Sequence, residues 1–228
     1  MSDTTALFVV SEEGYWAEEC IEPLTTLDDA GVDVTVATPS GSPPVVDERS
    51  LDPADVGEET VAAYREIHET DDRLRDPEPI ARTDAAEYDA VVFHGTVWDV
   101  NHDRHARTAL REAVAGDDGT PLVVCHAVGI LGFARTPNGE FLVDGRDVTG
   151  FPNEWEEGIV DELDRVEGRK LPYWVEDEVV AAGGNFDAEL DADTSVAVDG
   201  DLITARGPGS SSEAAETLLA ELDVEASA

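Results

Sequence analysis

The stretch LVVCHAVG, residues 122–129, places a cysteine and a histidine directly after a run of apolar residues. The Val-rich run is typical of a strand buried on both faces, and the small residues from Ala127 onward predict a short apolar helix. Cys125 therefore lies at a strand-to-helix turn, where the helix dipole can stabilise a thiolate. Beside it, His126 can stabilise that thiolate or carry a proton. Position alone fits a nucleophile and a small buried hydrophobic residue equally well.

Three similar apolar runs precede this one, and helical patterns separate them. The four predicted strands are ALFVV (6–10), DVTVATP (33–39), YDAVVF (88–93) and PLVVC (121–125). Helices are predicted over residues 12–31, 54–75 and 102–115. Continuous apolar strands that alternate with helices predict a parallel sheet covered by helices on both faces.

The pattern changes after residue 140. FLVDGRDVTGF (141–151) and SVAVDGDLITA (195–205) each carry an Asp-Gly pair between apolar runs, which predicts two β-hairpins. Helices are predicted over 172–184 and 210–222, the second one capped by serines. We find no internal repeat and no linker. The sequence therefore predicts one domain over residues 1–228, an α/β doubly wound and mainly parallel sheet with β-hairpin extensions.

The chain is strongly acidic. Its 228 residues include 53 Asp and Glu against 14 Lys and Arg, a formal net charge of -39 at pH 7. Self-repulsion of this size opposes compaction, and molar salt screens it because the Debye length falls to about 3 Å. We therefore expect a folded protein from a halophilic source with a salt-rich cytoplasm. The same charge excludes nucleic acid from the expected partners.

Signals for other compartments and other sites are missing from the sequence. Two cysteines are too few for a disulfide framework, and no apolar stretch approaches the roughly 20 residues of a membrane span. The N-terminus lacks a signal-peptide pattern, so we expect a cytoplasmic protein with no membrane partner. There is no phosphate-binding loop, no dinucleotide-binding fingerprint and no serine nucleophile elbow. Cys20 is expected to pack inward from its helix without a catalytic task.

Several potential metal ligands follow the third predicted strand. They are His94, His102, His105, Asp99 and Asp103. Zinc accepts such ligands, but His102 and His105 are expected to open a polar surface helix. We therefore predict no metal site and no cofactor.

Longer segments of the chain resemble a known family. GYWAEECIEPLTTLDDAGVDVTVATPSG, HGTVWDV, VVCH, VTGFPNEWEE and DGDLITARGPGSSSEAAETLL together resemble the DJ-1/PfpI superfamily, which is class I glutamine amidotransferase-like. Within it the chain looks like the Hsp31-like branch, which includes glutathione-independent glyoxalases and stress chaperones. The resemblance runs from about residue 6 to residue 222. It implies a flavodoxin-like sheet with a nucleophile elbow at Cys125.

The resemblance also implies roles for individual residues. Cys125 matches the nucleophile and His126 the histidine beside it. Glu19 matches the acid that contacts the nucleophile, with Glu18 as the alternative. Glu156 matches the acid that orients the histidine, with Glu157 as the alternative. The loop that borders the substrate pocket contains His94, Gly95 and Trp98.

Two departures from the family pattern concern the same site. Relatives often carry paired glycines just before the HGT segment, whereas here Phe93 runs straight into His94. Ala127 and Val128 replace the glycine and proline that usually follow the Cys-His pair. Either change implies an altered substrate choice, or a pocket that binds without turnover.

The function implied by the resemblance is that of a glyoxalase III-type lyase in stress protection. It would convert a small reactive aldehyde such as methylglyoxal to a hydroxy acid without a cofactor, in a protein that forms a homodimer. Two alternatives stay open, a holdase chaperone and a cysteine-dependent amidase or peptidase.

Overall fold

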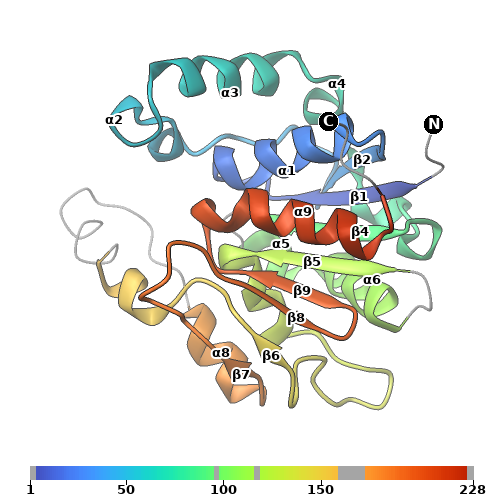
Figure 1. Ribbon diagram of the computed structural model, residues 1–228. Helices are drawn as coiled ribbons and strands as arrows, with labels where there is room; N and C mark the ends of the chain where they lie inside the picture. Colours follow the sequence, from blue (N-terminus) through green and yellow to red (C-terminus); the bar gives the residue numbers. More distant parts are fainter. Residues whose placement is uncertain (1–3, 95–97, 116–118, 159–172, 225–228) are drawn as a thin grey trace.

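The computed structural model describes residues 4–94, 98–115, 119–158 and 173–224 (Figure 1). Among them lies a seven-stranded sheet with the strand order β3-β2-β1-β4-β5-β9-β8. All neighbouring strands in it are parallel except β8 and β9. The strands are β1 (Thr5–Val10), β2 (Asp33–Thr38), β3 (Glu78–Pro79), β4 (Ala90–His94), β5 (Thr120–Val124), β8 (Val196–Asp199) and β9 (Leu202–Ala205). This is the predicted α/β, flavodoxin-like architecture.

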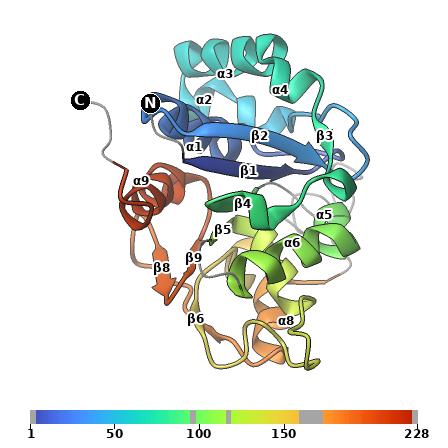
Figure 2. The same cartoon turned by 90° about the vertical axis from the view of Figure 1, so that its right-hand side faces the viewer.

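Helices cover both faces of the sheet, as Figure 2 shows with α9 on one side and α6 and α8 on the other. The described α-helices are α1 (Ala17–Asp29), α2 (Pro53–Val56), α3 (Glu58–Thr70), α4 (Asp72–Arg75), α5 (Trp98–His102), α6 (Arg104–Ala115), α8 (Val175–Ala181) and α9 (Ser211–Glu221). Residues 153–158 are also helical. The 3₁₀-helices are η1 (Glu48–Leu51), η2 (Ile80–Arg82), η3 (Ala85–Glu87), η4 (Cys125–Gly132) and η5 (Pro208–Ser210).

The continuous apolar strands arise because successive side chains enter two different cores. Phe8 and Val10 of β1 pack in the core that includes α1 and α9. Leu7 and Val9 point to the opposite face and pack with α6, η4 and α8. Side chains on a strand alternate between its two faces. When both faces are covered, every side chain is buried, so the strand is a continuous apolar run. The same rule accounts for β4 and β5.

One of the two predicted hairpins is confirmed and the other is wrong. β8 and β9 form an antiparallel pair, with Gly200 at a φ of 63° in the turn. Over residues 141–151 the Asp-Gly pair also turns the chain, since Gly145 has a φ of 78°. The following strand β6 (Asp147–Val148), however, pairs in parallel with β7 (Asn185–Phe186). The turn has its own hydrogen bond from the Arg146 N–H to the Val143 carbonyl, and the Gly145 N–H donates to the carbonyl of the distant Gly183.

Two further local predictions differ from the structure. Ser210 does not cap α9 with its side chain, because its hydroxyl accepts a hydrogen bond from the Ser195 N–H at 3.0 Å. The helix expected from Ala127 is a 3₁₀-helix that begins two residues earlier, at Cys125. No helix in the described part of the chain is long and apolar enough to cross a membrane.

Candidate active site

The carboxyl ends of three adjacent parallel strands meet at one edge of the sheet. The register pairs Val10, the last residue of β1, with His94, the last residue of β4. Phe93 of β4 is paired with Val123, two residues before Cys125. Ligand sites in open α/β sheets lie beyond this edge. The polar residues predicted to gather here are therefore delivered by β1, β4 and β5.

Cys125 occupies a strained backbone position. It directly follows β5 and opens η4 with a φ of 58°, in the left-handed region that non-glycine residues rarely adopt. Such a conformation costs about 1–2 kcal/mol for a residue with a side chain. It reverses the chain sharply after the strand, as expected for a nucleophile elbow. The Cys125 residue is only 3% exposed.

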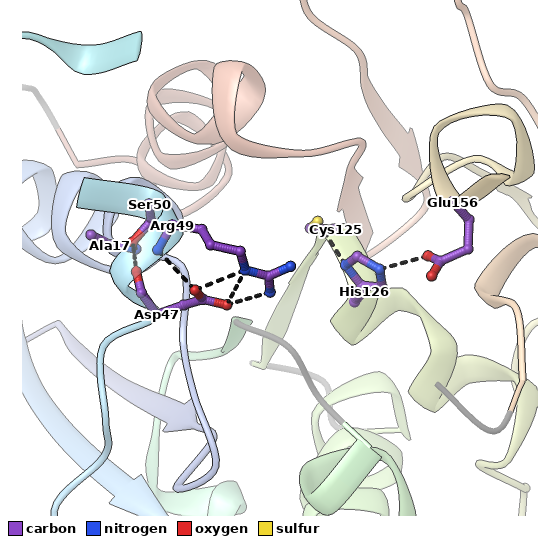
Figure 3. Close-up of polar contacts among 7 residues, drawn as sticks. All are labelled: Ala17, Asp47, Arg49, Ser50, Cys125, His126 and Glu156. Atoms are coloured by element: carbon purple, nitrogen blue, oxygen red, sulfur yellow. Dashed lines mark hydrogen bonds and ion pairs between the residues drawn. The ribbon is translucent and has the colours of Figure 1, made fainter. Parts of the chain in front are cut away.

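His126 lies between the thiol and an acid (Figure 3). Its Nδ1 is 3.4 Å from Cys125 Sγ, and its Nε2 is 2.9 Å from Glu156 Oε2. Glu156 and His126 are both buried, whereas Glu157 is exposed. The Phe151 ring stacks on the imidazole with 4.1 Å between centroids, which restricts rotation of the histidine side chain. The structure thus brings together Cys125, His126 and Glu156 in a linear arrangement.

Glu19 approaches the same sulfur from α1 and is 1% exposed. Burial raises the pKa of the Cys125 thiol well above its usual value, and both the charge of Glu19 and its hydrogen bond to the thiol raise this pKa further. The backbone N–H of His126 acts in the opposite direction. Glu18, the alternative acid, is half-buried, and burial followed by the charge of Glu22 raises its pKa. Of the two carboxylates, Glu19 is the one that interacts with the thiol.

The segment after Cys125 differs from the α-helix whose dipole could stabilise a thiolate. The element after Cys125 is an eight-residue 3₁₀-helix whose residues are all buried. Its hydrogen-bond geometry is poorer than that of an α-helix. Burial and the nearby Glu19 carboxylate both raise the pKa of the thiol and so favour its protonated form.

A hydrogen-bond network fixes the start of α1, which carries Glu19. The Ala17 N–H donates to the Ser50 hydroxyl at 3.0 Å, and that hydroxyl donates to the Asp47 carbonyl at 2.6 Å. The Asp47 carboxylate in turn accepts hydrogen bonds from the side chain of Arg49 (Figure 3). This external capping compensates for Trp16, which precedes the helix and provides no side-chain cap.

Of the three expected substrate-binding residues, the structure describes only His94 in full. His94 is completely buried, its ring centroid is 4.6 Å from that of Phe8, and burial lowers its pKa to about 3. Neither ring nitrogen of His94 has a hydrogen-bond partner among the described residues, although the Glu19 backbone lies nearby. Gly95 lies outside the described residues. Trp98 begins α5, and its side chain is likewise outside the described part.

Two residues near the site were not predicted. One is Phe151, which stacks on His126. The other is Asn101, fully buried, which donates to the His126 carbonyl at 3.2 Å and to the Tyr173 hydroxyl at 2.6 Å. Both lie in segments that the family resemblance covers. Their contacts come from tertiary packing, for which the sequence carries no periodic signal.

Of the three histidines considered as zinc ligands, His94 ends β4 at this site, and the other two lie on α5 and α6. His102 ends α5 and its ring packs against Phe133, whereas His105 lies in the first turn of α6. Within the described ranges, no group of three or more His, Cys, Asp or Glu side chains is arranged to hold a metal ion. Cys20 is completely buried in α1, as predicted.

Comparisons with known proteins agree with the fold. The model of the DJ-1/PfpI family matches residues 4–221. A solved structure known only by a target label is 26% identical, covers 97% of this chain and 99% of its own, and superposes with a TM-score of 0.80. Rapid Encystment Protein 24 kDa from Francisella tularensis is 23% identical over 96% of this chain and 99% of its own, with a TM-score of 0.80.

Glyoxalase III from Candida albicans is 20% identical over 98% of both chains, with a TM-score of 0.81. At these identities the second and third structures establish similarity of fold alone. No curated protein sequence matches this chain significantly.

Proposed function

This chain belongs to the DJ-1/PfpI family, and from that premise we propose that it is a cysteine-dependent enzyme acting on small reactive carbonyls of the methylglyoxal type. The observation that carries the proposal is the position of the Cys125 thiol between two acid–base groups. Glu19 interacts with the thiol, and so does His126, which is paired with Glu156. Converting a dicarbonyl to a hydroxy acid needs both a nucleophile and proton transfers at carbon and at oxygen.

The first step is addition of the thiol to the aldehyde. Nδ1 of His126 takes the thiol proton, the sulfur forms a bond to the aldehyde carbon, and the proton passes to the carbonyl oxygen. The product is a hemithioacetal. Because the pKa of Cys125 is raised, this base is needed for attack at neutral pH.

The second step isomerises the adduct. The Glu19 carboxylate removes the hydrogen on the carbon bound to sulfur, and the electron pair forms an enediolate with its negative charge on the oxygen of the neighbouring carbonyl. Return of this proton to the neighbouring carbon, with transfer of the adduct's hydroxyl proton to the neighbouring oxygen, gives the thioester of a hydroxy acid. The oxidation of one carbon is balanced by the reduction of the next, so no external oxidant or reductant takes part.

The third step releases the product. Nδ1 of His126 accepts a proton from water, which adds to the thioester carbonyl. The carbon–sulfur bond then breaks, and the imidazolium returns its proton to the departing sulfur. Glu156 stabilises the imidazolium that forms. The net reaction consumes one dicarbonyl and one water and yields one hydroxy acid, with the Cys125 thiol restored.

The enclosure of the site favours a small substrate. Cys125 is 3% exposed, and the Phe151 ring covers His126. A two- or three-carbon aldehyde needs far less space around the sulfur than a peptide does. The match in fold to a glyoxalase III supports the same substrate class.

A Cys-His-Glu arrangement also suits hydrolysis of small amides, which is the second candidate function.

One experiment separates these functions. Purified protein is assayed for hydroxy-acid formation from methylglyoxal and glyoxal, and for ammonia release from small amides. We expect wild type to form the hydroxy acid, Cys125→Ser to be inactive, and Cys20→Ala, which removes the other buried thiol, to retain activity. Ammonia release without aldehyde consumption would favour the amidase. If neither reaction occurs while Cys125→Ser still suppresses aggregation of a client protein, the chaperone alternative replaces the enzyme.

A further inference from the structure

We propose that four arginines around α6 form a binding site for a small organic polyanion, separate from the site at Cys125. Arg104, Arg107 and Arg111 of α6 and Arg135, which lies just after η4, line a hollow of about 600 Å³. Binding pockets for small molecules usually measure about 300–1,000 Å³. None of the residues proposed for catalysis lines this hollow.

The concentration of positive charge is exceptional for this chain. Only 14 of its 228 residues are Lys or Arg, and four of these face one hollow in a protein of net charge -39. On α6, spacings of three and four residues put the three arginines on the same helix face. Like charges so arranged repel one another, and an anion bound between them removes that repulsion.

These guanidiniums lack the close carboxylate partners that five other arginines of the described structure have. Arg49, Arg65, Arg73, Arg75 and Arg146 each pair with a carboxylate at 2.5–3.1 Å. In the hollow, the Arg104 side chain donates to Nε2 of His105 and the Arg107 side chain to the Asn101 carbonyl, and neither acceptor is a carboxylate. Arg111 has a carboxylate, Glu112, only at 3.7 Å. Each guanidinium carries five N–H donors, so most of these donors remain for a ligand.

One of the four arginines is held in place before any ligand binds. Arg135 donates to the Gly139 carbonyl at 2.8 Å, and its guanidinium lies 3.7 Å from the centroid of the Phe141 ring. A stacked, hydrogen-bonded guanidinium loses little conformational freedom when it binds an anion.

His102, which lies near Arg107, has a pKa below its usual value. Burial is the larger cause, and the positive charge of Arg107 is the second. His102 therefore stays uncharged at neutral pH, and the arginines carry the charge.

The lining defines the class of ligand. Planar guanidiniums bind phosphate and carboxylate groups through paired hydrogen bonds, and four of them suit a molecule with several negative charges. The half-buried rings of Phe133 and Phe141 add apolar surface, which suits an organic rather than a bare inorganic anion. Glu178, the one carboxylate in the lining, can accept a hydrogen bond from a ligand hydroxyl or amine. A phosphate ester or a polycarboxylic acid has these properties.

Calorimetric titration at fixed ionic strength tests the site, with pyrophosphate and citrate as separate probes for phosphate and carboxylate recognition. We expect saturable binding of at least one probe to wild type and to Cys125→Ser. In the double variant Arg107→Gln/Arg111→Gln, the affinity for the probe should fall by about tenfold or more, because two charge-assisted contacts are lost. Arg65→Gln is the matched control, since Arg65 is a half-exposed arginine of α3 already paired with Glu48.

Several results would overturn the proposal. They are the absence of saturable binding of both probes to wild type, unchanged affinity in a folded double variant, and an equal loss in Arg65→Gln. If the double variant does not fold, Arg104→Gln replaces it, because Arg104 is exposed at the start of α6 and its loss should still weaken binding. If the protein is an oligomer and pyrophosphate dissociates it, the occupant of the hollow is instead an acidic segment of a second copy of this chain.

Discussion

Glu156 Oε2 lies 2.9 Å from Nε2 of His126, and both side chains are buried. A carboxylate only accepts hydrogen bonds, so Nε2 carries the ring hydrogen, and the lone pair of Nδ1 faces Cys125. Glu156 therefore selects the tautomer of His126 that can take a proton from the thiol. It also compensates the charge of the imidazolium formed in that step.

Replacing Glu156 by Gln should reduce turnover of methylglyoxal by about 10²–10⁴-fold, because the base loses its orienting partner and its counter-charge. Initial rates of hydroxy-acid formation measure this. Glu157→Gln is the control, since it makes the same chemical change at an exposed neighbouring position. Equal losses in the two variants would remove Glu156 from the proposed mechanism.

Glu19→Gln should change turnover and thiol reactivity in opposite directions. Turnover should fall by about 10²–10⁴-fold, because glutamine cannot accept the carbon-bound proton. Alkylation of Cys125 by iodoacetamide at pH 7 should become faster, because removing the Glu19 charge lowers the pKa of the thiol. Peptide mapping distinguishes Cys125 from Cys20. Glu18→Gln should change neither quantity, and a slower alkylation in Glu19→Gln would contradict the assigned contact.

The strained backbone of Cys125 makes a prediction about stability. At a φ of 58°, Cys125→Gly should be more stable than Cys125→Ala by about 1 kcal/mol, because only alanine has a Cβ to strain. Urea unfolding at fixed salt measures the difference. At Cys20, inside α1, the order should reverse, since glycine costs a helix about 1 kcal/mol relative to alanine. If alanine were the more stable replacement at both positions, the elbow would not be strained.

The sequence predicts the central strands well because their evidence is local. β1, β2, β4 and β5 are each continuous apolar runs, and such runs follow directly from burial on both faces. The failed hairpin over 141–151 shows the limit of this reasoning. An Asp-Gly pair specifies a turn, but Gly145 is held by Gly183, and nothing near residue 145 in the sequence identifies that partner.

The candidate site divides in the same way. Cys125 and His126 are adjacent, so a strand-to-helix pattern is enough to single them out. Glu156 lies 30 residues further on and was identified only through resemblance to a family. The raised pKa of the thiol could not be predicted from the sequence, because it depends on the burial of Cys125 and on Glu19 reaching it from α1. Both are properties of the packed tertiary structure.

The acidity of the chain predicts a stability that depends on salt. Raising potassium chloride from about 0.1 M to about 1 M shortens the Debye length from about 10 Å to about 3 Å, which screens the repulsion within a chain of charge -39. Thermal melts followed by circular dichroism should therefore shift to higher temperature. Sucrose of matched osmolality stabilises by exclusion from the surface without screening charge, and serves as the control. A melting temperature independent of salt contradicts the prediction.

His94 provides the final prediction, on the dependence of stability on pH. Burial lowers the pKa of His94 to about 3, whereas an unfolded histidine titrates near 6.5. Between these values the unfolded chain binds the proton and the folded protein does not. Stability must therefore fall as the pH is lowered through this window, by up to about 1.4 kcal/mol per pH unit from this group.

The variant His94→Phe keeps a ring against Phe8 and removes the titration. Its carboxylates are those of wild type, so the difference in unfolding free energy between the two proteins isolates His94. We expect this difference to be constant near pH 8, where the imidazole is neutral in both states. It should change in favour of the variant as the pH falls from about 6 to about 4. If the difference in unfolding free energy between the two proteins does not change over this pH range, His94 is protonated in the folded state as easily as in the unfolded chain.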